Sequence, residues 1–261
     1  MNISLIKKNA LVGGASGGIG KAIAQQLAAS GANVTIMARN EDKLRAAIQT
    51  LSAADGQSHQ YLVVDFSDYE AYTKIISNYF ETNSVDILVN NTQGPSAGNT
   101  LEQKVSNYQE AFDLLFKTVV FTTKLALKQM IKNQWGRIIN VASISVKEPL
   151  SYLALSNTIR ASLVTWAKSL ATDVGKDQIT VNSILTGYFD TERIAQLNAK
   201  KAEQLGISED EVLAEMKSKV PLKRIGDPIE YAYLVAFLAS ENAAFITGTQ
   251  IPIDGGLLKS L

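Results

Sequence analysis

Short apolar runs alternate with longer segments of helical periodicity along the whole chain. The runs are rich in β-branched residues, are bounded by turn residues and are nearly continuous in apolar character, which is typical of strands buried on both faces. They cover residues 10–14, 33–38, 61–65, 86–90, 137–142, 179–185 and 250–254. This alternation predicts an α/β fold, a doubly wound parallel sheet of about seven strands with helices on both faces.

Helical periodicity fills the intervals between the predicted strands. One such segment ends at Gly31, a residue type that commonly terminates helices, and another covers residues 43–53. No linker or internal repeat interrupts the alternation. We therefore expect residues 1–261 to form a single domain.

The segment from residue 190 to residue 221 differs in composition from the other helical stretches. It is rich in Lys and Glu, and Ser208 and Glu211 have the spacing of a capping box. About thirty residues of this kind between two strands predict a helical lid over a substrate site. The alternative is a solvated helical excursion with no part in the site.

The charge balance and the scarcity of metal-binding side chains exclude several classes of function. Lys+Arg and Asp+Glu both number 25, so no basic excess favours nucleic acid or a membrane surface. With no cysteine and only His59, we expect neither a disulfide nor a metal site, and we expect His59 to be solvated. The chain has no membrane-spanning run and no signal-peptide pattern at its N-terminus, so we expect a cytoplasmic protein.

A glycine-rich loop follows the first predicted strand and opens the first predicted helix. Gly14, Gly18 and Gly20 have the spacing G-x-x-x-G-x-G. Glycine permits a tight turn and a close approach of the backbone to a pyrophosphate, and the following helix N-terminus offers free N–H groups. The loop therefore predicts a dinucleotide site.

The residue after the second predicted strand bears on which dinucleotide binds. An acid in this region holds the ribose hydroxyls of NAD, whereas a basic residue accommodates the 2′-phosphate of NADP. Arg39 follows Ala38 there, and acids come only at Glu41 and Asp42. Because arginine binds a phosphate with two parallel donors, NADP(H) is the favoured cofactor. The alternative is that Arg39 only begins a solvated helix.

The whole chain resembles the short-chain dehydrogenase/reductase family. Gly14, Gly18 and Gly20 match the family's T-G-x-x-x-G-x-G loop, with Gly13 in the place of threonine. Other positions that match its motifs are Asp65 beside the adenine, Asn90 and Asn91 of the N-N-A-G segment, Ser143 at the catalytic serine, Thr191 of the P-G-x-x-x-T loop and the Gly-Gly ending at 255–256.

The resemblance implies a Rossmann fold with one cofactor site and one catalytic centre. The cofactor-binding residues that it implies are Gly14, Ser16, Gly18, Ile19, Gly20, Arg39, Asp65, Phe66, Asn90, Asn91, Arg160, Gly187 and Thr191. It also implies a homotetramer or homodimer, with helices at 101–133 and 152–175 packing across one interface.

The family's Y-x-x-x-K proton-donor motif is altered in this chain. Counting thirteen residues from Ser143 gives Ser156 in the place of the tyrosine, and Arg160 stands in the place of the lysine. Leu115 aligns with a fourth family residue, an asparagine. A serine hydroxyl is far less acidic than a phenol, and arginine stays charged, so the usual acid is missing.

Other groups in this stretch are candidates for the missing acid. Tyr152 lies four residues before Ser156, so on a helix the two would share one face. Lys147 lies between Ser143 and that helix. A water held by Ser143 and Ser156 is the third candidate. The catalytic residues we expect are Ser143, Ser156, Arg160 and Tyr152.

These observations favour an NADP(H)-dependent oxidoreductase that interconverts a carbonyl and an alcohol. Within the family the chain most resembles the 3-oxoacyl-acyl-carrier-protein reductases, which implies a small-molecule or acyl-thioester carbonyl substrate. The alternative is an NADP(H)-binding sensor or assembly partner without turnover, because the glycine loop is intact beside a lost acid.

Overall fold

The apolar runs form one parallel sheet in the computed structural model, which describes residues 3–54 and 56–260. The strand order in this described part is β3-β2-β1-β4-β5-β6-β7. The strands are β1 Asn9–Gly13, β2 Asn33–Ala38, β3 Gln60–Val63, β4 Ile87–Asn90, β5 Gly136–Val141, β6 Ile179–Thr186 and β7 Gln250–Ile253. The predicted fold class, a doubly wound α/β sheet of seven strands, is confirmed.

Burial differs between the inner strands and the two edges of the sheet. Every residue of β5 is buried, whereas β3 and β7 contain only exposed and half-buried residues. The expectation that all seven strands are buried on both faces was therefore wrong for the edges. An edge strand has a neighbour on one side only, so less of its surface is covered.

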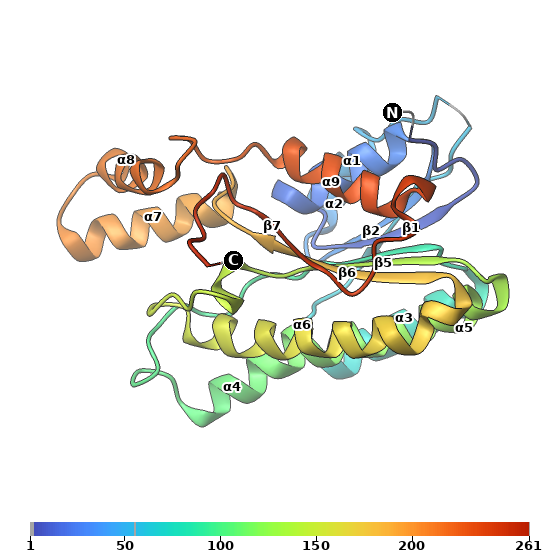
Figure 1. Cartoon of the computed structure of the whole chain (residues 1–261), viewed down its shortest axis with the longest axis horizontal. Helices are drawn as coiled ribbons and strands as arrows, with labels where there is room; N and C mark the ends of the chain where they lie inside the picture. Colours follow the sequence, from blue (N-terminus) through green and yellow to red (C-terminus); the bar gives the residue numbers. More distant parts are fainter. Residues whose placement is uncertain (1–2, 55, 261) are drawn as a thin grey trace.

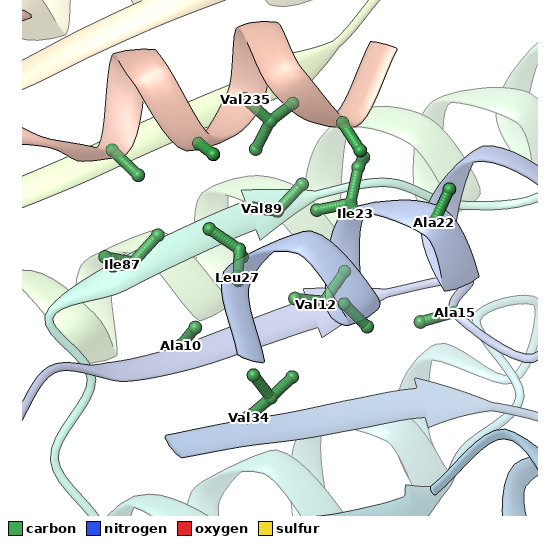
Figure 2. Close-up of a cluster of buried hydrophobic side chains, with 14 of the residues drawn as sticks. Ala10, Val12, Ala15, Ala22, Ile23, Leu27, Val34, Ile87, Val89 and Val235 are labelled. Carbon is green, nitrogen blue, oxygen red and sulfur yellow. The ribbon is translucent and has the colours of Figure 1, made fainter. Parts of the chain in front are cut away.

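Helices cover both faces of the sheet (Figure 1). One face carries α1 Gly18–Ala29, α2 Glu41–Ile48 and α9 Pro228–Ala239, and the other carries α3 Tyr69–Thr82, α4 Val105–Phe112, α5 Thr118–Asn133 and α6 Ala154–Val174. Figure 2 shows the first layer, where Ile23 and Leu27 of α1 and Val235 of α9 pack against strands β1 and β4. Short helical turns lie at η1 Asp113–Lys117, η2 Ile144–Val146, η3 Gly175–Asp177 and η4 Glu241–Ala243.

The strand order creates a crevice at the carboxyl ends of β1 and β4. Successive connections from β1 proceed toward β3, and those from β4 proceed toward β7, so the chain leaves these two neighbouring strands in opposite directions. Ligands of open α/β sheets bind at this switch point. The glycine loop follows β1, and Asn90 and Asn91 end and follow β4.

Two further helices extend beyond the carboxyl end of β6 (Figure 1). Helix α7 covers Glu192–Leu205 and ends at Gly206, which has a φ of +66°, and helix α8 covers Glu209–Lys219. Ser208 and Glu211 form the predicted capping box, since each side chain bonds the backbone N–H of the other. The helical character expected for residues 190–221 is confirmed, as a hairpin of two helices.

Candidate active site

The turn between β1 and α1 requires glycine at several positions, because any other residue would be strained or would clash there. Gly14 and Gly18 have φ values of +57° and +52°, a region that favours glycine. A Cβ at Gly20 would lie 2.2 Å from the carbonyl oxygen of Gly14, and one at Gly13 would lie 2.2 Å from that of Asn91. The sequence motif therefore marks positions where the backbone packs against backbone.

The N-terminus of α1 has free N–H groups and no competing acid. Gly17 is the N-cap and supplies no side-chain cap, and the first turn contains no Asp or Glu. The helical ladder begins with the bond from Lys21 N to Gly17 O, at 3.1 Å, so the N–H groups of Gly18, Ile19 and Gly20 precede it. Such an end binds a phosphate group, and Ser16 lies in the same turn.

The side-chain amides of Asn90 and Asn91 stabilise the segments that form the crevice. Asn91 Nδ2 donates to the carbonyl oxygen of Gly13 at 3.0 Å, which links β4 to the glycine loop. Asn90 is buried and its Nδ2 donates to Asn140 Oδ1 at 2.9 Å and Thr123 Oγ1 at 3.2 Å. Both predicted residues therefore lie at the site, where their side-chain amides support the loops.

Arg39 and Asp65 mark the end of the crevice at β2 and β3. Arg39 Nη1 lies 4.0 Å from Asp65 Oδ2, and both side chains are about half exposed. Burial acts to raise the pKa of Asp65, but the two hydrogen bonds from Ser67, with help from Arg39, outweigh it and lower the pKa. Phe66 is buried and packs on Tyr72, with ring centroids 5.3 Å apart, so its side chain belongs to the core.

Ser143 and the Arg160 guanidinium lie at the carboxyl end of β5, and Ser156 lies one helical turn before Arg160 on α6. Ser143 caps η2, and its Oγ accepts from Ser145 N at 3.1 Å. Ser156 lies in the first turn of α6, is 7% exposed, and its hydroxyl has no hydrogen-bond partner among the described residues. Arg160, one turn later, donates from Nη1 to the carbonyl oxygen of Val141, two residues before Ser143. The structure therefore brings Arg160 to the end of β5 that leads to Ser143, and the catalytic role of the three residues stays a prediction.

Arg160 is a positive group in largely buried surroundings. Burial lowers its pKa, Tyr231 acts against this, and the nearby Arg193 lowers it further. An arginine has so high an ordinary pKa that it keeps its charge at neutral pH. Arg160 therefore supplies a fixed charge and hydrogen-bond donors, and it does not release a proton.

Tyr152 does not lie on the helix that carries Ser156. Helix α6 begins at Ala154 with Leu153 as N-cap, so the prediction of a shared helical face was wrong. Burial raises the pKa of Tyr152 to about 12, and Tyr188 and Glu215 act in the same direction. A phenol with this pKa is a poor proton donor at neutral pH. The other candidate, Lys147, is an exposed residue at the end of η2.

Leu115 lies in the π-helical turn η1 and is 2% exposed within the core beneath the sheet. The family's asparagine position therefore carries an apolar side chain that holds no water. Sequence periodicity did not reveal the π turn, because its residues continue an ordinary amphipathic pattern. Local π turns frequently occur beside functional sites.

The loop from Thr186 to Thr191 lies against the glycine loop. A Cβ at Gly187 would be 2.6 Å from Asp254 Cα, so this position requires glycine. Thr191 caps α7 by accepting from Ile194 N at 3.3 Å. Its methyl carbon would lie 3.2 Å from a Cβ at Gly18. The start of α7 is therefore in contact with the predicted phosphate site.

Sequence reasoning missed three residues of this site. Arg193, in the first turn of α7, donates from Nη2 to the carbonyl oxygen of Pro95 at 3.0 Å. Tyr188 lies beside Tyr152, and the buried Tyr231 accepts a hydrogen bond from Thr186 Oγ1 at 3.1 Å. Arg193 was detectable as a cation two residues after the matched Thr191, whereas the two tyrosines carry no distinctive spacing.

A surface cavity of about 640 Å³ lies elsewhere. Its walls come from the end of α3 and from α5, including Phe80, Glu81 and Lys128. Helix α3 leads into β4, so its end lies at the amino edge of the sheet, opposite the motif residues. Chemistry and motif position therefore locate the candidate site better than cavity size.

The expectations about metals, membranes and His59 concern the rest of the molecule. Within residues 3–54 and 56–260, no group of three or more His, Asp or Glu side chains is arranged to hold a metal ion, and no helix is long and apolar enough to span a membrane. His59 is not simply solvated, because its Nδ1 accepts from Val34 N at 3.2 Å and its Nε2 lies 2.8 Å from Ser52 O.

Comparisons with known sequences agree with this geometry. The model of a family described as "Enoyl-(Acyl carrier protein) reductase" matches residues 14–258. The 3-oxoacyl-[acyl-carrier-protein] reductase FabG of Rickettsia conorii is 34% identical over 256 residues, which are 98% of this chain and 99% of the relative. The NADPH-dependent reductase BacG of Bacillus subtilis is 31% identical over 257 residues, with 98% and 99% coverage.

Solved structures give the same result for the fold. L-Sorbose reductase from Gluconobacter frateurii, in complex with NADPH and L-sorbose, is 31% identical with a TM-score of 0.92, and each chain is covered completely. A 3-oxoacyl (acyl-carrier-protein) reductase from Agrobacterium tumefaciens with NADP bound is 30% identical with a TM-score of 0.86, over 97% of this chain and 95% of the other. This chain belongs to the short-chain dehydrogenase/reductase family and resembles its 3-oxoacyl-acyl-carrier-protein reductases.

Proposed function

We propose that this chain is an NADP(H)-dependent oxidoreductase that interconverts a carbonyl and an alcohol through an atypical catalytic centre. The observation that carries the proposal is the uncapped N-terminus of α1, with Arg39 at one end of the crevice and Ser143 at the other. NADPH-dependent relatives at about 31% identity over nearly the whole chain support the choice of cofactor.

The residues present fit a dinucleotide phosphate. The N–H groups of Gly18, Ile19 and Gly20 lie in the uncapped first turn of α1 and have no acid beside them, so they hold the diphosphate. Arg39 provides the charge for a 2′-phosphate, and Asp65, kept ionised by Ser67, accepts from the adenine. When bound, the cofactor supplies the hydride, and the protein positions it.

At the reacting end, Ser143 donates its hydroxyl hydrogen to the substrate carbonyl oxygen and stabilises the charge that develops there. A water molecule held by Ser143 and Ser156 provides the proton. The unpartnered Ser156 hydroxyl and the small size of serine support this role, because a phenol would fill the same space. Loss of a general acid costs roughly 10²–10⁴ in rate, so we expect slow turnover.

A second candidate function is an NADP(H)-binding sensor or assembly partner without turnover. It is favoured by the position of Tyr152 outside α6 and by the fixed charge of Arg160. Neither side chain titrates near neutral pH, and Leu115 holds no water. Binding of NADPH without oxidation of it, over a broad set of carbonyl compounds, would distinguish this function from catalysis.

Residues 190–221 act as a substrate lid within a single domain. The substrate is a small-molecule or acyl-thioester carbonyl compound. The protein works in the cytoplasm as a homotetramer or homodimer. The contact between Thr191 and the glycine loop supports the lid, because Thr191 is the residue from which α7 begins.

The test is steady-state NADPH oxidation with 3-oxoacyl thioesters and small diketones. Ser143→Ala is expected to remove most of the activity, and Ser156→Ala to lower kcat by about tenfold with unchanged NADPH affinity, because a contact made only in the transition state affects kcat. Ser169→Ala, an exposed serine of α6 far along the helix, is the control. Full activity in Ser143→Ala on every substrate would show that the catalytic centre lies elsewhere.

A further inference from the structure

Two arginine side chains face the candidate site without a carboxylate partner. Arg160 bonds a backbone carbonyl from α6, and Arg193 bonds a backbone carbonyl from α7. Neither forms an ion pair with any carboxylate within residues 3–54 and 56–260. Arg160 is half-buried and Arg193 is exposed, and two neighbouring positive groups repel one another unless an anion lies between or beside them.

The acid nearest to Arg193 in the sequence is committed elsewhere. Glu192 accepts from Lys43 Nζ at 2.9 Å and 3.1 Å, an ion pair that ties the start of α7 to α2. Arg193 also lies in the first turn of α7, at the positive end of the helix dipole, where a cation is unfavourable. An anion bound at this end would offset both the repulsion between the two arginines and the unfavourable interaction of Arg193 with the helix dipole.

The two guanidinium groups approach the crevice from different elements. Arg193 lies over Gly94, where its Nη2 would be 3.5 Å from a Cβ, so no side chain intervenes between it and the loop after β4. Arg160 lies one helical turn from Ser156 and reaches the carbonyl of Val141 beside Ser143. Strands β4 and β5 are paired, with Asn90 opposite Asn140, so the loop after β4 that Arg193 contacts and the end of β5 that Arg160 contacts lie at the same edge of the sheet, and the charge of Arg193 acts on Arg160. A small anion next to the reacting carbonyl would therefore meet both.

We propose that Arg160 and Arg193 together bind an anionic oxygen group, and that this group is a carboxylate of the carbonyl substrate. The inference rests on the proposed function and narrows its substrate to oxo acids. Arginine suits a carboxylate because its planar fork donates two parallel hydrogen bonds. The cofactor diphosphate offers the same chemistry, since Thr191 places α7 against the glycine loop, so the experiment separates the two sources.

The first experiment compares 2-oxo and 3-oxo acids with their methyl esters, at saturating NADPH. Arg193→Gln is expected to lower kcat/KM for the acids by tenfold or more and to change it less than twofold for the esters. Arg193→Lys should restore part of the loss, because lysine keeps the positive charge but lacks the two parallel donors of the guanidinium group. Lys200→Gln, an exposed cation on the same helix, is the control and should match the unmodified protein. NADPH affinity, measured in parallel, should be unchanged in all three variants.

The second experiment does not require turnover. Calorimetric titration of each acid and each ester into the protein saturated with NADP⁺ should show tighter binding of the acid, and Arg193→Gln should abolish the difference. Weaker NADPH binding in Arg193→Gln, with acid and ester affected equally, assigns the anion to the diphosphate and overturns the substrate carboxylate. Equal binding of acids and esters to the unmodified protein overturns it as well. Absence of turnover with intact acid selectivity in the titration would refute the catalytic function and leave this inference standing.

Discussion

Arg39 is the single residue on which the choice of cofactor depends. Its guanidinium lies 4.0 Å from the Asp65 carboxylate, and both groups are exposed, so the pair is weak and Arg39 can turn to a phosphate. We expect NADPH to bind more tightly than NADH. Arg39→Asp should reverse this order, because two neighbouring carboxylates repel a 2′-phosphate whereas an aspartate accepts from ribose hydroxyls.

The expected size of this effect is about 10- to 100-fold in NADPH affinity, corresponding to one charge-assisted contact of about 1.5–3 kcal/mol. Fluorescence titration with both nucleotides gives the ratio. Arg45→Gln is the control, because Arg45 is a nearby exposed cation, on α2, that binds Glu41 at 2.7 Å. Equal affinities of the unmodified protein for the two nucleotides would contradict the prediction.

The sequence motifs predicted much of the site, because their residues occur at fixed spacing. Arg160 reaches the end of β5 beside Ser143, and Gly14, Gly18 and Gly20 form the turn that their spacing indicated. Arg193 was missed for a physical reason. Its position over Gly94 depends on how the loops after β4 and β6 fold together, and no periodicity encodes that contact.

At the scale of elements, one acid links the two helices of the α7–α8 hairpin. Glu215 of α8 accepts from Lys201 of α7 at 2.6 Å and from Lys219 at 2.6 Å. These two hydrogen bonds, with the charges of the same lysines, lower the pKa of Glu215 to about 2. The ordinary value is 4.5, so the pair stabilises the hairpin fully above that pH and progressively less as the pH falls toward 2.

Amide hydrogen exchange, corrected for the intrinsic effect of pH, measures this directly. We expect α7 and α8 to lose protection between pH 6 and pH 3, and Glu215→Gln to show the reduced protection already at pH 6. Glu203→Gln, an exposed acid of α7 that forms no ion pair with a described residue, should behave like the unmodified protein. Unchanged protection in Glu215→Gln at pH 6 would refute the role of this acid.

Element boundaries explain where the sequence prediction failed. Periodicity placed Tyr152 on a helix, but Gly98 N donates to Tyr152 O at 2.8 Å and Ala154 N donates to Gly98 O at 3.1 Å. These bonds hold residues 152–154 against a loop more than fifty residues earlier, so the helix starts late. Such a long-range contact is invisible to a local pattern. The capping box at Ser208, which is local, was predicted correctly.

At the scale of the whole molecule, large apolar side chains remain exposed on the side of α4. Leu101 is 97% exposed and Val105, four residues later at the start of α4, is 88% exposed. This is the helical region for which family resemblance implies packing between subunits. Burial of both side chains would gain roughly 1.5–3 kcal/mol each, which favours association. We expect a dimer or tetramer at micromolar concentration.

Sedimentation velocity tests this prediction, since a monomer has a mass of 28.2 kDa. The double change Leu101→Glu with Val105→Glu should shift the protein toward smaller species, because the charges would be buried without partners. Phe245→Glu is the matched comparison, since Phe245 is fully exposed in the loop before β7, outside this helical region. Dissociation by Phe245→Glu alone would move the interface to the β7 edge, and a monomeric unmodified protein would refute association altogether.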